Sequence, residues 1–174
     1  KLLRETTAFW GKIENIKIQF GEKEISARKL TVSSEIPLDI ESGWEKITKS
    51  ATLEFVAEGV IKFHPLDGKF PETWKEGEII KTKMTAYGFI PLLDIHSLSF
   101  EKIDYKEKII ETKEKDNVAK VWDHKMSLKP ISENSFYYED EIILYGGITT
   151  GVLTWWAKTF YEHRHKRWQL LASK

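Results

Sequence analysis

Two residues that exchange protons near neutral or acidic pH, His124 and Asp140, stand near the middle of two long alternating segments close to the C-terminus. The segments cover residues 119–128 and 135–146, and in each the apolar side chains recur at every second position. This period is typical of a β-strand with one buried face. The inward row of the first segment is Trp122, His124, Met126 and Leu128, and that of the second is Phe136, Tyr138, Asp140, Ile142 and Leu144.

The register of the hairpin decides whether the two ionisable residues meet. If residues 130–134 form the turn and Leu128 lies opposite Phe136, then Met126 faces Tyr138 and Trp122 faces Ile142. His124 then lies directly across from Asp140. A carboxylate beside an imidazole fixes its tautomer and raises its pKa, so the pair is suited to anchor a ligand or to act as acid and base. A structural hydrogen bond in the core is the other interpretation.

A third candidate, Arg164, lies on the last amphipathic segment, residues 149–171, which predicts a long helix. Its apolar stripe comprises Leu153, Trp156, Ala157, Phe160, Trp168 and Leu171, with Arg164 in the middle and Trp155 on the polar side. A guanidinium without a partner among aromatic side chains would be costly. We therefore predict that Arg164 is mostly buried and forms an ion pair with a carboxylate of the sheet, or else binds a carboxylate of a ligand.

Other chemistry finds little support in the sequence. His163 and His165 stand two residues apart on the predicted helix, so their side chains diverge, and cations in its last turns complement the helix dipole. The chain has no phosphate-binding loop, dinucleotide fingerprint, nucleophile elbow or zinc-protease motif. We expect neither a metal nor a cofactor.

The composition narrows the class of protein. The 174 residues contain 27 Lys and Arg against 27 Asp and Glu, so no overall field attracts nucleic acid. Cysteine is absent, which excludes disulfides and thiolate catalysis and is typical of a cytoplasmic domain. No apolar run approaches the roughly 18 residues that cross a bilayer, so we expect no stable membrane insertion. These observations leave the oligomeric state open.

The remaining patterns predict a single domain of the α+β class. Two alternating pieces, residues 13–20 and 24–33, predict a hairpin, or one strand after a loop. Ile40, Trp44, Ile47 and Ala51 predict a short helix capped by Asp39, with a second helix at 52–57 and a strand at 60–63. Residues 66–77 predict a surface loop, and 78–88, 94–103 and 107–116 predict three strands before the final pair.

With these elements in order, the chain resembles the START-like (SRPBCC) superfamily, which includes Bet v 1-like proteins, lipid-transfer domains and polyketide cyclases. The resemblance covers residues 24–171 and rests on the element order and on loose motifs that look like those of bacterial members: Trp122-Asp123-His124, Tyr138-x-Asp140, Gly146-Gly147 and Tyr161-x-His163-Arg164-x-x-Arg167-Trp168. It implies a helix-grip fold, in which a curved antiparallel sheet wraps around a long C-terminal helix and encloses a hydrophobic cavity. Residues 1–174 then form one domain, with 1–22 as an N-terminal extension.

The resemblance implies two functions, and the seven tryptophans of the chain, which could fill a small cavity, add a third. The first is binding of a small hydrophobic ligand (a lipid, polyketide or aromatic compound) in the cavity. The second is a cyclase or aromatase-type enzyme that uses His124 or Asp140 as acid and base, and the third is an interaction scaffold whose cavity is filled by its own side chains. The residues expected to line the cavity are Met84, Leu98, Phe100, Trp122, His124, Met126, Tyr138, Asp140, Ile142, Trp156, Phe160 and Arg164.

Overall fold

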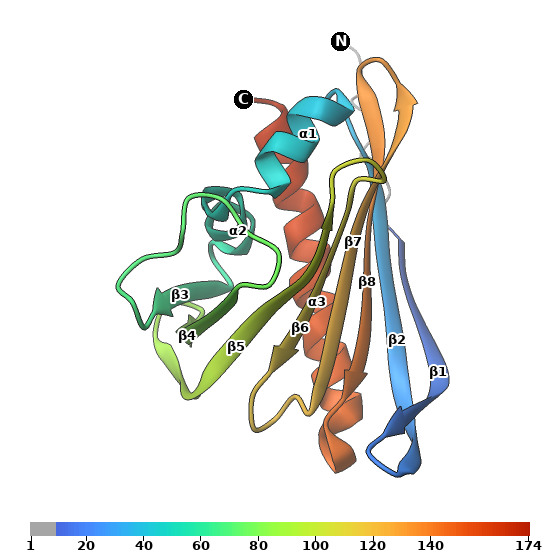
Figure 1. Cartoon of the computed structure of the whole chain (residues 1–174), viewed down its shortest axis with the longest axis vertical. Helices are drawn as coiled ribbons and strands as arrows, with labels where there is room; N and C mark the ends of the chain where they lie inside the picture. The colour runs from blue at the N-terminus through green and yellow to red at the C-terminus, as the bar shows by residue number, and fades with distance from the viewer. Residues whose placement is uncertain (1–9) are drawn as a thin grey trace.

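A computed structural model describes residues 10–174 as a curved antiparallel sheet and three α-helices (Figure 1). The strands are β1 (Trp10–Phe20), β2 (Lys23–Ile36), β3 (Ile61–Pro65), β4 (Ile79–Ala86), β5 (Ile90–Asp104), β6 (Ile109–Lys115), β7 (Val121–Ser132) and β8 (Ser135–Tyr145). The helices are α1 (Ile40–Ile47), α2 (Ser50–Ala57) and α3 (Thr150–Ala172), and a 3-10 turn η1 (Gly147–Thr149) precedes α3. The eight strands form one sheet in the order β1-β2-β8-β7-β6-β5-β4-β3.

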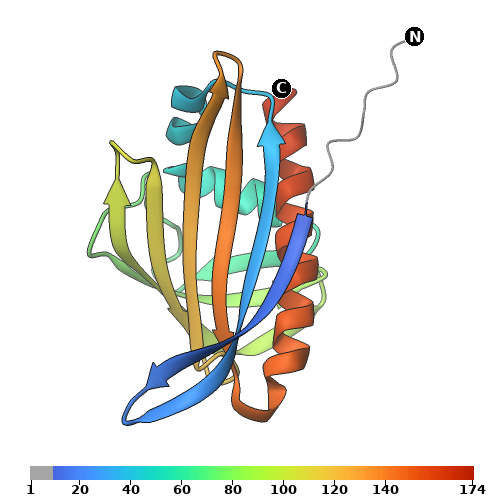
Figure 2. The same cartoon turned by 90° about the vertical axis from the view of Figure 1, so that its right-hand side faces the viewer.

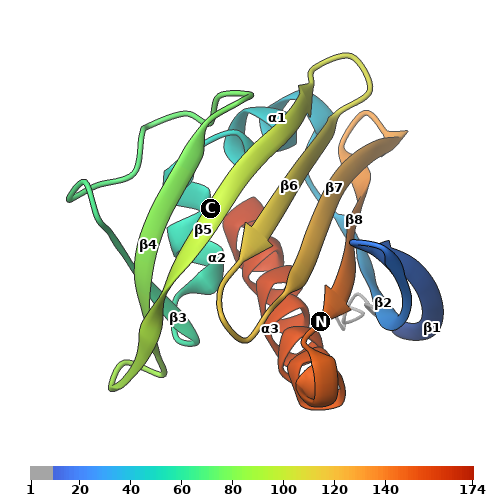
Figure 3. The ribbon, with the colours of Figure 1, turned by 60° about the horizontal axis from the view of Figure 1, so that its bottom comes forward.

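Helix α3 lies along the concave side of this sheet. Figure 3, which looks toward the lower end of the molecule, shows the strands curving around α3, while α1 and α2 close the upper end of the concave side. Figure 2 shows α3 beside β2 and β1, and the closed end of the β1–β2 hairpin points away from the start of α3. The arrangement confirms the predicted helix-grip architecture, because a sheet with one apolar face must cover it with another layer.

The start of the chain contributes more to the sheet than the sequence predicts. Residues 10–20, which fall in the predicted extension, form the edge strand β1 and pair with β2 along its whole length. Gly21 closes this hairpin with φ +60°, a conformation that glycine adopts without strain. Of the two alternatives for this region, the structure has the hairpin.

The two short helices differ from the predicted ones at their boundary. Asp39 caps α1 as expected, because its side chain accepts a hydrogen bond from the Ser42 backbone N–H at 2.9 Å. The predicted helix through Ala51 is too long. The extended backbone of Lys49 (φ −101°, ψ 137°) separates α1 from α2, so Ala51 belongs to the second helix.

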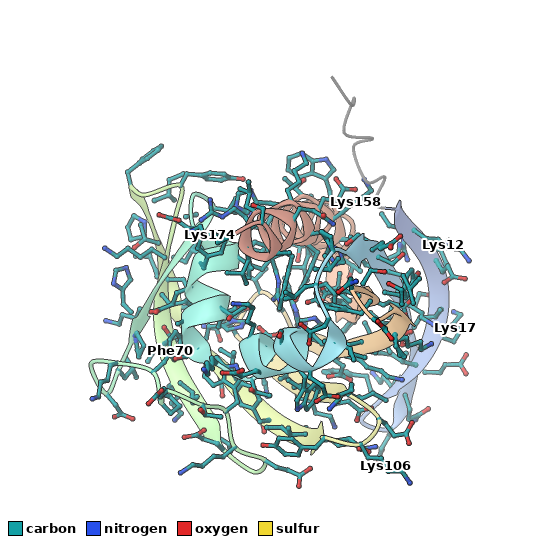
Figure 4. All side chains as sticks on the ribbon, turned by 90° about the horizontal axis from the view of Figure 1, so that it is seen from above. Lys12, Lys17, Phe70, Lys106, Lys158 and Lys174 are labelled. Atoms are coloured by element: carbon teal, nitrogen blue, oxygen red, sulfur yellow. The ribbon has the colours of Figure 1, made fainter. Side chains whose placement is uncertain are left out.

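The segment 66–77 has no regular helix or strand, but it is not confined to the surface as predicted. Phe70 and Trp74 are buried, and the Trp74 ring stacks on Phe100 with centroids 4.7 Å apart. The backbone N–H of Trp74 also donates to the Thr48 carbonyl at 2.9 Å, and this hydrogen bond holds the segment against the end of α1. In the view from above, Phe70 lies on the side of β3 and β4, whereas the labelled lysines Lys12, Lys17 and Lys106 lie at the periphery (Figure 4).

The interior between sheet and helices contains two apolar clusters. One gathers α1, α2 and the end of α3 around Trp168, and the other gathers the first half of α3 around Phe160. On β7, His124 follows Trp122 of the second cluster and precedes Met126 of the first. His124 therefore lies at the junction of the two clusters.

Candidate functional site

The His124 and Asp140 side chains meet, although the predicted register is wrong. Leu128 lies opposite Tyr138 rather than Phe136, so His124 faces Ile142 and Asp140 faces Met126. The turn is also tighter than predicted, because Ser132 already pairs with Ser135. A shift of two residues keeps every side chain on its face of the sheet, so the two residues become diagonal neighbours. His124 Nε2 lies 2.6 Å from Asp140 Oδ1, and both residues are buried beneath α3.

Asp140 accepts two further hydrogen bonds. The Tyr138 hydroxyl donates to Oδ1 at 2.8 Å, and His165 Nε2 donates to Oδ2 at 3.0 Å. Burial would raise the pKa of Asp140, but the charge of Arg164 and the bond from His124 outweigh it and hold that pKa well below its usual range. Asp140 is thus a buried carboxylate whose charge is stabilised by its surroundings.

His165 is a member of this site that the sequence interpretation missed. It was assigned to the cationic end of the helix, yet it is fully buried and its ring stacks on Tyr138 with centroids 4.7 Å apart. Its Nδ1 lies 2.6 Å from Ser34 Oγ. His165 lies four residues after Tyr161 and three residues before Trp168, and this helical spacing is the signal that places it on the covered side of α3. His163, which diverges from it as expected, contacts the Glu58 carbonyl instead.

Ser34, His165 and Asp140 have the residue types of a hydrolytic triad, but the geometry does not support that chemistry. Ser34 is 3% exposed and the other two are fully buried. None of the three lines the larger pocket described below, so a substrate there does not reach the Ser34 hydroxyl. The three side chains form a structural hydrogen-bonded group.

Three further ionisable residues, on β5, β6 and the loop after β6, extend this group of buried polar side chains across the sheet from β7 toward β5. Together they form a row of ionisable side chains. His96 Nε2 lies 2.9 Å from Glu114 Oε1 and its Nδ1 lies 3.0 Å from Asp116 Oδ2. Glu114 Oε2 in turn lies 3.6 Å from His124 Nδ1. The row therefore runs from Asp116 through His96, Glu114, His124 and Asp140 to His165. Glu114 was also missed, although it alternates inward with Ile110 and Thr112 on the predicted strand.

The pKa values in this row favour charged groups. Burial would lower the pKa of His96, but hydrogen bonds with Asp116 and Glu114 outweigh it and raise the pKa to about 9. Burial would raise the pKa of Glu114, but bonds with His124 and His96 lower it to about 2. Burial also opposes the charge on His124, yet Asp140 raises its pKa. Each carboxylate thus stabilises the imidazole beside it.

Arg164 is buried as predicted, but the predicted ion pair is absent. Within residues 10–174, no carboxylate oxygen lies within 4.0 Å of its guanidinium nitrogens. Its Nη2 instead donates to the Tyr138 hydroxyl at 3.3 Å, and the guanidinium carbon lies 5.2 Å from the Tyr161 ring centroid. The Tyr138 hydroxyl thus stands between Arg164 and Asp140. Charge balance comes from the row as a whole, because Glu114, Asp116 and Asp140 offset His96, His124 and Arg164.

An apolar pocket with a volume of about 480 Å³ lies beside this row, between the first half of α3 and the strands β3 to β7. Four of the twelve expected residues line it: Met84, Trp122, Trp156 and Phe160. The sequence interpretation missed several of its other apolar residues: Ile61, Phe63, Leu92, Leu93, Val118, Val152, Leu153 and Trp155. Trp155, assigned to the polar side of the helix, belongs to this pocket because the pocket opens at the end of the sheet where α3 begins.

A second, smaller hollow of about 50 Å³ lies deeper along α3. The expected residues that line it are Leu98, Phe100, His124, Met126, Phe160 and Arg164. Tyr138, Asp140 and Ile142 line neither hollow, because the α3 side chains cover them. The expected set of twelve is therefore divided between two hollows and the core.

The described residues contain no group of three His, Asp or Glu side chains placed to hold a metal ion. None of the helices within residues 10–174 combines the length and the apolar character needed to cross a bilayer.

Comparison with solved structures shows the START-like helix-grip fold. The chain is similar to a START superfamily protein from Mycobacterium smegmatis, with 8% identity and a TM-score of 0.60 over 83% of this chain and 97% of that one. It is similar to an aromatase/cyclase from a Streptomyces species, with 7% identity and a TM-score of 0.59 over 84% and 91%. It is also similar to the major latex-like protein 151 of Panax ginseng, with 13% identity and a TM-score of 0.59 over 83% and 96%.

Sequence comparison gives the family more directly. No curated protein matches the chain in sequence. One family model does match, over residues 64–171, which include β4 to β8 and nearly all of α3 and hence most of both hollows. The chain belongs to that family, which is described as a domain of unknown function (DUF8410).

Proposed function

We propose that the protein binds a small, largely hydrophobic ligand in the 480 Å³ pocket between α3 and the sheet. The observation that carries the proposal is this pocket, whose volume falls in the range of about 300–1,000 Å³ that is usual for small-molecule sites. Its inner wall is buried and aromatic, with Trp122 and Phe160, and these side chains offer a large apolar area to a ligand.

The rim of the pocket supports the same proposal. Leu93, Val152 and Trp155 are 94%, 72% and 67% exposed and lie at its mouth. Exposed apolar side chains that gather around one pocket are typical of binding sites, because their exposure to water is unfavourable. The fold of the relatives adds a consistent context, since one of them is an aromatase/cyclase that shares this architecture.

The proposal assigns new roles to the polar residues. Those that border the pocket are Asp94, His96, Glu114 and Asp116, and His124 and Asp140 stand behind them. Both ring nitrogens of His96 are already bonded to carboxylates. His96 therefore fixes Glu114 and Asp116 in place, and the carboxylates are the polar groups that a ligand meets.

Titration with 2-propylnaphthalene, an apolar aromatic hydrocarbon, tests the proposal by calorimetry. We expect saturable binding by the wild-type protein and at least about tenfold weaker binding by Trp156→Ala, which removes an aromatic wall of the pocket. Ile131→Ala is the control, because Ile131 is exposed at the tip of the β7–β8 hairpin and lines neither hollow. Absence of saturable binding by the wild-type protein would favour the interaction scaffold instead.

A cyclase or aromatase-type enzyme is the second candidate, and one observation favours it. The ionisable row that contains His124 and Asp140 reaches the pocket wall through Glu114. Exchange of the α-hydrogens of 2-propionylnaphthalene in D₂O, followed by NMR, tests this candidate. Exchange above the buffer rate that is lost in Glu114→Gln would support the enzyme, and exchange at the buffer rate alone would count against it.

A further inference from the structure

Two buried N–H groups on residues that line the smaller hollow have no hydrogen-bond partner among the described residues. These groups are Arg164 Nε and Trp168 Nε1. Arg164 is 6% exposed and Trp168 is 1% exposed, and both side chains line the hollow. A buried donor without a partner is costly, so native structures nearly always supply an acceptor.

The chemistry of the missing partner follows from the two groups. Guanidinium and indole nitrogens only donate, so the partner must present an acceptor atom. The hollow measures about 50 Å³. This exceeds the roughly 10–15 Å³ that a single water oxygen requires, so it has room for the oxygen of a larger molecule.

The charges nearby favour a neutral acceptor. Glu114 also lines the hollow, and the pKa of its carboxyl is lowered to about 2, so it is ionised. The buried row is already balanced by His96, His124 and Arg164. A carboxylate would add an uncompensated charge beside Glu114, whereas a carbonyl oxygen accepts from Arg164 and Trp168 without one.

The two hollows adjoin. Phe63, Glu114 and Phe160 line both of them, so these three side chains stand where the two hollows meet. A ligand with its apolar body in the larger pocket would pass its polar end between these side chains to reach Arg164.

We propose that the ligand is a hydrophobic carbonyl compound, such as an aryl ketone, ester or amide, whose oxygen accepts hydrogen bonds from Arg164 Nε and Trp168 Nε1 in the small hollow. This inference rests on the proposed function, because it places the apolar body in the larger pocket.

Three naphthalenes of similar size test the inference by calorimetry: the ketone 2-propionylnaphthalene, the hydrocarbon 2-propylnaphthalene and the carboxylate 2-naphthaleneacetate. We expect the ketone to bind about tenfold more tightly than the hydrocarbon, since hydrogen bonds to charged groups are the stronger ones, and more tightly than the carboxylate. If the hydrocarbon binds but the ketone binds no more tightly, the small hollow does not take a carbonyl oxygen, and the inference is wrong while the proposed function stands. If the carboxylate binds most tightly, the inference is also wrong. If none binds, the proposed function itself fails.

A pair of Trp→Phe variants isolates the donor. Trp168→Phe keeps the aromatic ring and removes the N–H, so we expect it to weaken ketone binding by about three- to tenfold and to leave hydrocarbon binding unchanged. Trp44→Phe is the matched control, because Trp44 Nε1 is also buried without a partner but lines neither hollow. In ¹⁵N spectra, the Trp168 indole signal should shift with the ketone and not with the hydrocarbon. Equal effects of Trp168→Phe on ketone and hydrocarbon, or an unmoved indole signal at saturation with ketone, would overturn the inference.

Discussion

Replacement of Asp140 by asparagine should strongly lower the free energy of unfolding, although it exchanges only one carboxylate oxygen for an NH₂ group. Asp140 accepts hydrogen bonds from His124, Tyr138 and His165 at 2.6, 2.8 and 3.0 Å, and all four residues are buried. An asparagine keeps one acceptor oxygen, but its NH₂ group would face at least one of these donors. The change also removes the carboxylate whose charge balances His124 and Arg164. Breaking a buried charge pair by removing one partner costs about 3–5 kcal/mol, and we expect Asp140→Asn to fall in this range.

Urea unfolding followed by circular dichroism measures this loss directly, and a fall in Tm of roughly 10–15 °C should accompany it. Asp123→Asn is the matched control. Asp123 lies on β7 beside His124 but on the other face of the sheet, and burial raises the pKa of its carboxyl, so loss of its charge should change stability by no more than about 0.5 kcal/mol. The reasoning is refuted if Asp140→Asn costs less than about 1 kcal/mol, or no more than Asp123→Asn does.

Two other predictions concern stability. The pKa of His96 is raised from 6.5 to about 9 on folding, so its ion pairs stabilise the protein fully below pH 6.5, and this contribution, on the order of 3 kcal/mol, is lost as the pH rises through 9. Urea unfolding at several pH values should record this decline, and His96→Gln should flatten it; an unchanged slope in the variant would contradict the assignment. Gly43→Ala should destabilise by about 1–3 kcal/mol, because its Cβ would lie 2.3 Å from the buried Phe136 ring. A Cβ at Gly151 would meet nothing within 4 Å, so Gly151→Ala should stabilise α3 by up to about 1 kcal/mol. Equal changes of Tm in the two alanine variants would show that the Phe136 contact is unimportant.

The fold was largely predictable from the sequence, because alternation and helical period report which side chains face inward. Alternation does not report register. The β7–β8 hairpin is shifted by two residues from the predicted pairing, and a shift of two leaves the inward row of each strand unchanged. His124 and Asp140 therefore meet despite the wrong register, since a diagonal pair is still within reach of an imidazole. The boundary at Lys49 and the burial of Trp74 depend on tertiary contacts that no local pattern contains.

The site was predictable only in part. Met84, Trp122, Trp156 and Phe160 were expected and line the larger pocket, whereas Tyr138, Asp140 and Ile142 are covered by α3. Helical or alternating periodicity identifies which face of a helix or strand is buried. It does not show where along that face the helix separates from the sheet and leaves a pocket. The pocket lies toward the start of α3, and this position depends on the packing of the whole helix against the strands.

The most direct test of ligand binding uses the two methionines of the sequence, Met84 and Met126. Met84 lines the larger pocket, and Met126 lies in the smaller hollow with its sulfur 3.8 Å from Arg164 Nη2. In protein labelled with ¹³C at the methionine methyl groups, titration with 2-propylnaphthalene should shift the Met84 signal saturably and leave the Met126 signal nearly unmoved. A Met84 signal that does not move up to the solubility limit of the hydrocarbon would contradict the proposal that this pocket binds a hydrophobic ligand.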